Sequence, residues 1–183
     1  MRLERLGKHL VKLNYSPDLI HKFSYKYVAL DTNVLILAVS DDDFLKLLHD
    51  LKLNNCSFHT VASVYYEFTG TSDNPDNYNK RVKLFEDLEI VIQPIERKMD
   101  EIKEFAYVLR KQTKVDYADL LLCSCLYKQH GSYVLTENHK HFPLTLLDRE
   151  DIITIDKGSD IRNIAVYSLS QEKFDKAAKK LLG

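Results

Sequence analysis

The chain has 183 residues, of which 45% are hydrophobic and 29% are charged, and its formal net charge is −1. These values are typical of a soluble globular domain, and no apolar run is long enough for a membrane span. The net charge excludes a strongly basic protein that binds nucleic acid by charge alone. The charged N-terminal segment lacks the apolar core of a secretory signal, so we expect a cytoplasmic protein. The five glycines form no phosphate-binding loop, which argues against dinucleotide and NTP enzymes.

Hydrophobic periodicity predicts strands and helices in alternation. Leu3, Leu6, Leu10 and Leu13 recur at helical spacing and predict an N-terminal helix. Residues 34–39 fit either a buried helical turn or more strand, and the turn-rich residues 70–79 are predicted as an exposed loop. The predicted strands are 27–30, 56–61, 89–95, 132–136 and 152–155, and 164–169 is predicted as an edge strand. The other predicted helices are 40–53, 62–68, 79–88, 102–109, 117–128 and 174–181.

This alternation predicts a three-layer α/β/α fold around a mainly parallel sheet of about five strands. We expect an N-terminal helical extension at residues 1–24, an α/β domain at 25–157, and a C-terminal strand and helix at 158–183 that pack on the domain. Cys56, Cys123 and Cys125 are an odd number of cysteines, and we interpret them as packing residues.

Four acidic residues stand close to predicted strand ends or helix starts. Asp31 interrupts the apolar run "YKYVALDTNVLIL" and is either a helix N-cap or a functional acid. Glu67 follows the second strand, where a surface position is the alternative. Asp119 lies in the first turn of a very apolar helix, where a lone buried charge is costly unless it is paired or metal-bound. Asp116, three residues earlier, is either the N-cap of that helix or a second acid on the same face.

Oxygen-bearing residues also follow the strand at 132–136. Thr136, Glu137 and Asn138 occur in "VLTENHKHF". Because sites in open α/β sheets form at the carboxyl ends of strands, these residues and the acids predict a Mg²⁺ or Mn²⁺ site. His139 and His141 are interpreted as surface residues or substrate contacts rather than metal ligands.

The motifs "VALDTNVLI", "VASVYYEF", "VDYADLLLCSC" and "VLTENHKHF" together resemble those of the PIN-domain ribonucleases. The resemblance covers about Lys26 to Asp156 and leaves out both terminal extensions. It implies cleavage of RNA phosphodiester bonds that depends on Mg²⁺ or Mn²⁺, with water attacking the phosphorus in line.

The resemblance also implies a role for each acid. Asp31, Glu67 and Asp119 would be metal ligands, and Asp116 an auxiliary acid. Asn138 departs from the pattern, because the family often has an aspartate there. The asparagine can still coordinate through its carbonyl oxygen, but it removes one negative charge.

Neighbouring residues complete the predicted site. Thr32 and Asn33 would start the next helix and help fix the carboxylate of Asp31, Thr136 supplies a hydroxyl, and Glu137 would compensate for the lost charge if it turned inward. The candidate contacts to the RNA backbone are Lys80, Arg81, Lys83, Lys111, Lys114 and Lys140, and the candidates for base stacking are Tyr65, Tyr66 and Tyr78.

Other functions fit the same sequence. A PIN-like module with a weakened metal site would bind RNA or protein without cleaving it, and Asn138 favours that alternative. The chain could also be the toxin of a toxin–antitoxin pair, held by a partner peptide. A phosphatase with Asp31 as nucleophile needs a second aspartate where Asn33 stands, which argues against it. Dimerisation is common in the family, although no residue compels it, and we expect no membrane partner.

Overall fold

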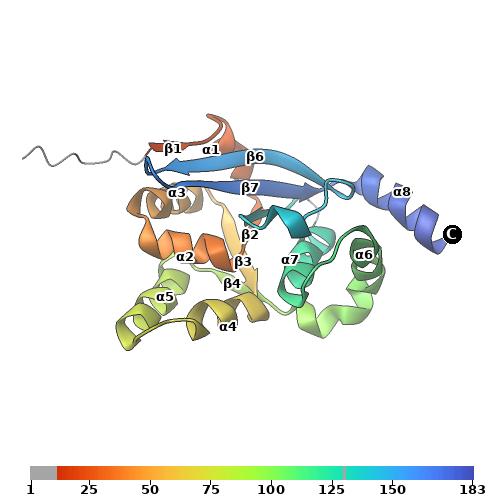
Figure 1. Ribbon diagram of the computed structural model, residues 1–183, viewed down its shortest axis with the longest axis horizontal. Coiled ribbons are helices and arrows are strands. Elements are labelled where there is room, and N and C mark those ends of the chain that lie inside the picture. The colour runs from red at the N-terminus through yellow and green to blue at the C-terminus, as the bar shows by residue number, and fades with distance from the viewer. Residues whose placement is uncertain (1–11, 130) are drawn as a thin grey trace, which may run out of the picture.

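A seven-stranded mixed β-sheet forms the centre of the computed structural model, which describes residues 12–129 and 131–183 (Figure 1). The strands are β1 (Lys12–Asn14), β2 (Tyr27–Leu30), β3 (Ser57–Val61), β4 (Val91–Gln93), β5 (Tyr133–Thr136), β6 (Leu147–Asp156) and β7 (Ile161–Leu169). Their order in the sheet is β1-β6-β7-β5-β2-β3-β4. Strands β5, β2, β3 and β4 run parallel, whereas β1, β6 and β7 pair antiparallel to their neighbours. The chain is therefore an α/β protein with a parallel core.

Eight α-helices accompany the sheet within the described residues. They are α1 (Leu19–Phe23), α2 (Thr32–Ser40), α3 (Asp42–Leu53), α4 (Ala62–Gly70), α5 (Pro75–Asp87), α6 (Met99–Gln112), α7 (Tyr117–Lys128) and α8 (Gln171–Leu182), with short 3₁₀ turns η1 (Ile95–Lys98) and η2 (His139–His141). Helix α2 contacts α3, α4 and α5, whereas α6 contacts α7 and α8. The two groups lie apart along the sheet (Figure 1). None of these helices has the length and apolarity that a membrane span requires.

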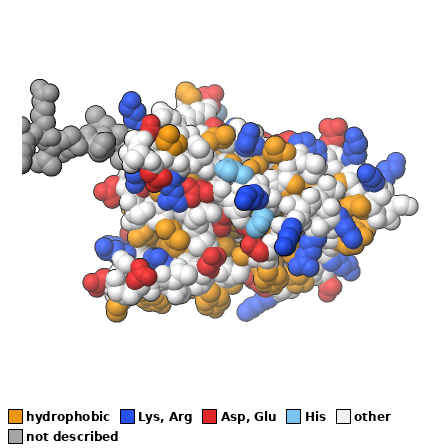
Figure 2. All heavy atoms as spheres, in the orientation of Figure 1, with side chains coloured by type: hydrophobic (Ala, Val, Ile, Leu, Met, Phe, Trp, Pro, Cys, Tyr) orange, Lys and Arg blue, Asp and Glu red, His pale blue; other side chains and the backbone are white. Residues whose placement is uncertain are grey.

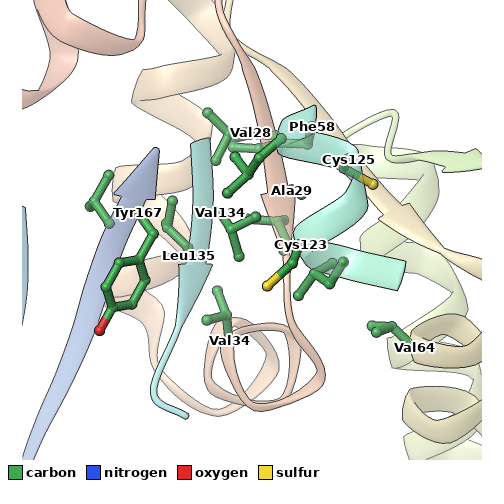
Figure 3. Packing of buried hydrophobic residues seen from close by; sticks show 14 of the residues in the cluster. Val28, Ala29, Val34, Phe58, Val64, Cys123, Cys125, Val134, Leu135 and Tyr167 are labelled. Carbon is green, nitrogen blue, oxygen red and sulfur yellow. The ribbon is translucent and has the colours of Figure 1, made fainter. Parts of the chain in front are cut away.

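Strands β2, β3 and β5 are mostly buried, as expected for parallel strands covered on both faces, whereas β4 at the edge of the sheet is exposed. Val28 of β2 and Val134 of β5 are fully buried, and α7 supplies the buried Cys123. Figure 3 shows side chains of α7 and α2 directed toward these strands. All three cysteines are free and buried, so they pack in the core as predicted.

The prediction of an edge strand at 164–169 was wrong. Strand β7 lies inside the sheet, between β5 and β6, and is antiparallel to both. Residues 164–167 of β7 are buried, which explains their continuous apolar run, because an interior strand needs apolar side chains on both faces. The sheet thus has more strands, and more antiparallel pairs, than predicted.

The N-terminal region also differs from its prediction. Leu13, expected at the end of a helix, lies in β1 and pairs with Ile155 of β6. The rest of the predicted helix, at residues 3–10, lies outside the described residues.

The predicted loop at 70–79 is mostly helical. Helix α4 extends to Gly70, and α5 begins at Pro75 after Asn74, whose side chain accepts a hydrogen bond from the amide of Asn77 at 2.9 Å. Proline at the first helical position after an asparagine N-cap is a helix start signal, which the turn-rich composition obscured.

Candidate metal and phosphodiester site

A pocket of about 230 Å³ opens at the carboxyl ends of the parallel strands. Its lining residues are Asp31, Thr32, Asn33, Ile36, Glu67, Asp116, Ala118, Asp119 and Asn138. All four predicted acids share this pocket, and no lysine or arginine is among the lining residues. The pocket therefore concentrates negative charge, and we call it the acidic pocket.

Asp31 follows β2 directly and is the N-cap of α2, so the capping interpretation is correct. Only 6% of the residue is exposed. Its carboxylate accepts hydrogen bonds from the amide of Thr32 (2.7 Å), from Nδ2 of Asn33 (2.8 Å) and from Oγ1 of Thr136 (2.5 Å). Burial raises the pKa of Asp31 above its usual value, although these hydrogen bonds oppose the shift, and the charge of Glu67 raises it further. Capping thus leaves the carboxylate fixed in the wall of the acidic pocket.

Asp119 lies in the first turn of α7 and is 4% exposed. Asp116 caps the same helix and accepts a hydrogen bond from the amide of Asp119 at 2.9 Å. Burial raises the pKa of Asp119 to about 6; a hydrogen bond with His141 opposes this shift, whereas the charges of Asp31 and Asp116 add to it. The charges of Asp31 and Asp116 repel that of Asp119. A proton on Asp119, or a cation bound among the three carboxylates, would relieve this repulsion.

Glu67 reaches the pocket from α4. It is an exposed residue, and its Oε2 accepts a hydrogen bond from Oγ1 of Thr32 at 2.7 Å. Thr32 therefore connects the carboxylates of α2 and α4, since its backbone amide also bonds to Asp31.

The three residues after β5 take different orientations. Thr136 is fully buried, and its hydroxyl accepts a hydrogen bond from the amide of Asn138 at 2.8 Å. Asn138 lines the pocket, but its side-chain amide donates to Asp119 Oδ2 at 2.9 Å. Glu137 forms a salt bridge with Arg162 of β7, with Nε donating to Oε1 at 2.8 Å, and it does not line the pocket. Glu137 therefore does not supply the charge that Asn138 lacks.

His141 is a neighbour of the acids that we did not predict as a ligand. Its Nδ1 is hydrogen-bonded to Asp119 Oδ2, lies 3.0 Å from Nδ2 of Asn138, and is 3.7 Å from Asp116 Oδ2. Potential ligand atoms of Asp116, Asp119 and His141 all lie within 4.8 Å of one another. The 3₁₀ turn η2 brings His141 to the acids, and no spacing in the sequence signals this turn.

The predicted RNA contacts separate into two groups. Lys114 and Lys140 are exposed near the start of α7, where Thr113 Oγ1 donates to the carbonyl oxygen of Lys140 at 3.0 Å. Lys80 and Arg81, by contrast, line a different pocket between α2 and α5.

Two predicted side chains take part in packing. Arg81 donates to Thr71 Oγ1 at 2.9 Å and to the carbonyl oxygen of Phe68, and its guanidinium lies 5.1 Å from the ring centroid of Phe68. Tyr65 packs edge-on against Phe85, whereas Tyr66 is 70% exposed. Arg81 and Tyr65 therefore have structural contacts that explain their presence without RNA.

The comparisons with known proteins give no relative of this chain: no family model, no curated protein and no solved structure matches it.

Proposed function

We propose that this protein is a metal-dependent endoribonuclease with a PIN-like three-layer fold, which hydrolyses RNA phosphodiester bonds in the acidic pocket. The main support is that Asp31, Glu67 and Asp119 come from three separate segments and line one pocket, together with Asp116. Such a concentration of carboxylates without a lining lysine or arginine is costly unless a cation binds among them.

The donor chemistry of the pocket fits Mg²⁺ or Mn²⁺. Carboxylate oxygens are the ligands these ions prefer, and Asp31, Glu67 and Asp119 would hold the ion with Asp116 nearby. Burial raises the pKa of Asp31 and of Asp119, so both carboxylates are poorly solvated and would gain from a bound cation. When bound, such an ion supplies Lewis-acid polarisation of a phosphate oxygen.

The chain's own residues position the carboxylates and the substrate. Thr136, Asn33 and the amide of Thr32 hold the Asp31 carboxylate in one orientation. Without metal, the pKa of Asp119 is raised to about 6, so near neutral pH this carboxyl must release its proton before it can hold a cation. Lys114 and Lys140 bring positive charge toward an approaching phosphate.

The distribution of charge agrees with a polyanionic substrate. Figure 2 shows Lys and Arg side chains concentrated over α6, α7 and α8, while many Asp and Glu side chains lie toward the opposite end of this face. An RNA strand would therefore approach the acidic pocket from the side of α6 and α7.

One observation favours the alternative of a binding module with a weak metal site. The amide group of Asn138 donates to Asp119, and His141 occupies the same oxygen, Oδ2. Both contacts would have to rearrange before that oxygen could bind a cation. The affinity of a binding module for RNA would be the same with EDTA as with Mn²⁺, and it would cleave no RNA.

The test is cleavage of a panel of single-stranded and structured RNAs with Mn²⁺, Mg²⁺ or EDTA. We expect metal-dependent cleavage that falls by at least about 100-fold in Asp31→Asn and Asp119→Asn, the loss typical of removing one group that stabilises charge in a transition state. Asp100→Asn, an exposed acid in the first turn of α6, is the matched control and should cleave normally. Equal cleavage by all four proteins would indicate a contaminant and contradict the proposal. So would a wild-type protein that neither cleaves nor gains thermal stability with Mn²⁺.

A further inference from the structure

A second pocket, also of about 230 Å³, lies between α2 and α5. Helix α2 contributes Ile36, Val39 and Ser40, and α5 contributes Asn77, Lys80 and Arg81. Both sets have the spacing i, i+3, i+4, so each comes from a single face of its helix. We call this the α2–α5 pocket.

The α2–α5 pocket adjoins the acidic pocket. Ile36 lines both, and it is 37% exposed. Asn33, Ile36 and Ser40 lie on the same face of α2, where the helical rise puts about 10 Å between the first and the last. This is about three times the 3.4 Å axial rise per nucleotide in a strand of DNA. A strand with a phosphate in the acidic pocket can therefore place a base up to about three nucleotides away in the α2–α5 pocket.

The lining chemistry combines apolar surface with free polar groups. Ile36 and Val39 offer an apolar surface to the face of a ring. The side-chain amide of Asn77 forms no hydrogen bond with any described residue, so its donor and acceptor are both available. Lys80 is exposed and has no salt bridge within the described part of the chain.

Arg81 gives the pocket a fixed wall. Its contacts with Thr71 and Phe68 hold the guanidinium against α4, so this side chain loses little freedom when a ligand binds beside it. Lys80 carries its charge on a flexible stem and is exposed, so it can move to meet the solvent-exposed phosphate of a ligand.

We propose that the α2–α5 pocket binds the base of a nucleotide within about three of the scissile phosphate, with Asn77 bonded to the base edge and Lys80 near its phosphate. This inference rests on the proposed function for the acidic pocket and specifies its substrate as unpaired RNA. A base can enter a pocket between two helices only when it is not paired and stacked in a duplex. The pocket thus selects single-stranded segments by the accessibility of one base.

The test uses binding rather than cleavage, so that it does not depend on catalysis. Fluorescein-labelled single-stranded hexanucleotide RNAs, each abasic at one position in turn, are titrated with the protein in EDTA, and fluorescence anisotropy gives the affinity. We expect one abasic position to weaken binding at least about fivefold. Asn77→Ala should weaken binding of the complete RNA about fivefold, the size of one hydrogen bond, and should cause no further loss with that abasic RNA.

Asn79→Ala is the matched control, since Asn79 is an exposed asparagine on the same helix that does not line the pocket. Both substitutions replace asparagine by a better helix former, so neither should unfold α5. Equal affinities of the two variants, no position-specific effect of abasic substitution, or failure of the wild type to bind these RNAs would overturn the inference.

The result separates this inference from the proposed function. If the Asn77 and abasic effects coincide but the wild type neither cleaves RNA nor gains thermal stability with Mn²⁺, the base pocket stands and the nuclease proposal fails. If cleavage is normal and metal-dependent but the abasic series is flat, the nuclease proposal stands and the base pocket fails.

Discussion

Replacing Asp119 with asparagine should stabilise the metal-free protein at neutral pH. Burial raises the pKa of Asp119 from the usual 3.8 to about 6. The hydrogen bond from His141 opposes this shift, and the charges of Asp31 and Asp116 add to it. The folded state therefore binds this proton more tightly than the unfolded state does. The stability associated with Asp119 is greatest below about pH 4 and is lost as the pH rises to about 6. Asparagine has no proton to lose and gains no charge over this range.

The size of the effect follows from the shift. A change from 3.8 to about 6 corresponds to about 3 kcal/mol, which is an upper limit for the gain of Asp119→Asn above about pH 7. For a chain of this length, about 3 kcal/mol raises Tm by about 6–12 °C. Asparagine can keep the hydrogen bond from Asn138 through its own carbonyl oxygen, so the substitution leaves that donor paired.

Urea unfolding followed by circular dichroism in EDTA measures this difference across pH. The free energy of unfolding of Asp119→Asn should match that of the wild type near about pH 4 and exceed it by up to about 3 kcal/mol near about pH 7. Asp100→Asn, in the exposed first turn of α6, should show no such trend. A difference between Asp119→Asn and wild type that does not change with pH, or that has the opposite sign, would refute the reasoning. Saturating Mn²⁺ should then stabilise the wild type and leave Asp119→Asn nearly unchanged.

Three other substitutions test separate parts of the structure. Thr136→Val removes the hydroxyl that donates to Asp31 and should weaken Mn²⁺ binding about 10- to 100-fold by calorimetry; an unchanged affinity would show that this hydrogen bond does not position the carboxylate. Asn138→Asp adds a carboxylate and should lower stability in EDTA while it strengthens Mn²⁺ binding, so a loss of Mn²⁺ affinity would argue against coordination at this position. Lys157→Met leaves the buried Asp41 without its partner at 2.7 Å and should cost about 1–2 kcal/mol in urea unfolding at neutral pH. Burial alone would raise the pKa of Asp41, but the hydrogen bond and charge of Lys157 lower it overall. The cost of Lys157→Met should therefore fade below about pH 4, where Asp41 becomes protonated. A cost that persists there would contradict the ion pair.

The parallel core of the fold could be predicted from the sequence, but the antiparallel part could not. Alternating strands and helices at 27–128 predict parallel pairing because a helical crossover returns the chain in the same direction. The pairing of β7 with both β5 and β6 has no such local signal. Its buried run at 164–167 indicates an interior strand, but periodicity does not say which strands lie beside it.

The sequence predicted which acids come together where backbone geometry fixes the side chain. Asp31 stands at the end of a strand and Asp119 in the first turn of a helix, so topology alone brings them near the same edge. The orientation of Glu137 depends on its salt bridge with the distant Arg162, and that of His141 depends on the 3₁₀ turn η2. The sequence pattern carries no information on either. Whether the acids act as metal ligands stays a prediction.

The place of β7 in the sheet also affects how the protein folds during synthesis. Thr136 of β5 pairs with Ala165 of β7, so β5 keeps an open edge until the ribosome has made residues 161–169. By Asp156 the nascent chain already contains Asp31, Glu67 and Asp119, but it lacks the strand that closes the sheet beside them. Pairing between segments made at different times is slow because the chain must first close a loop. The edge of β5 that β7 covers is therefore closed only after every residue that lines the acidic pocket has been made.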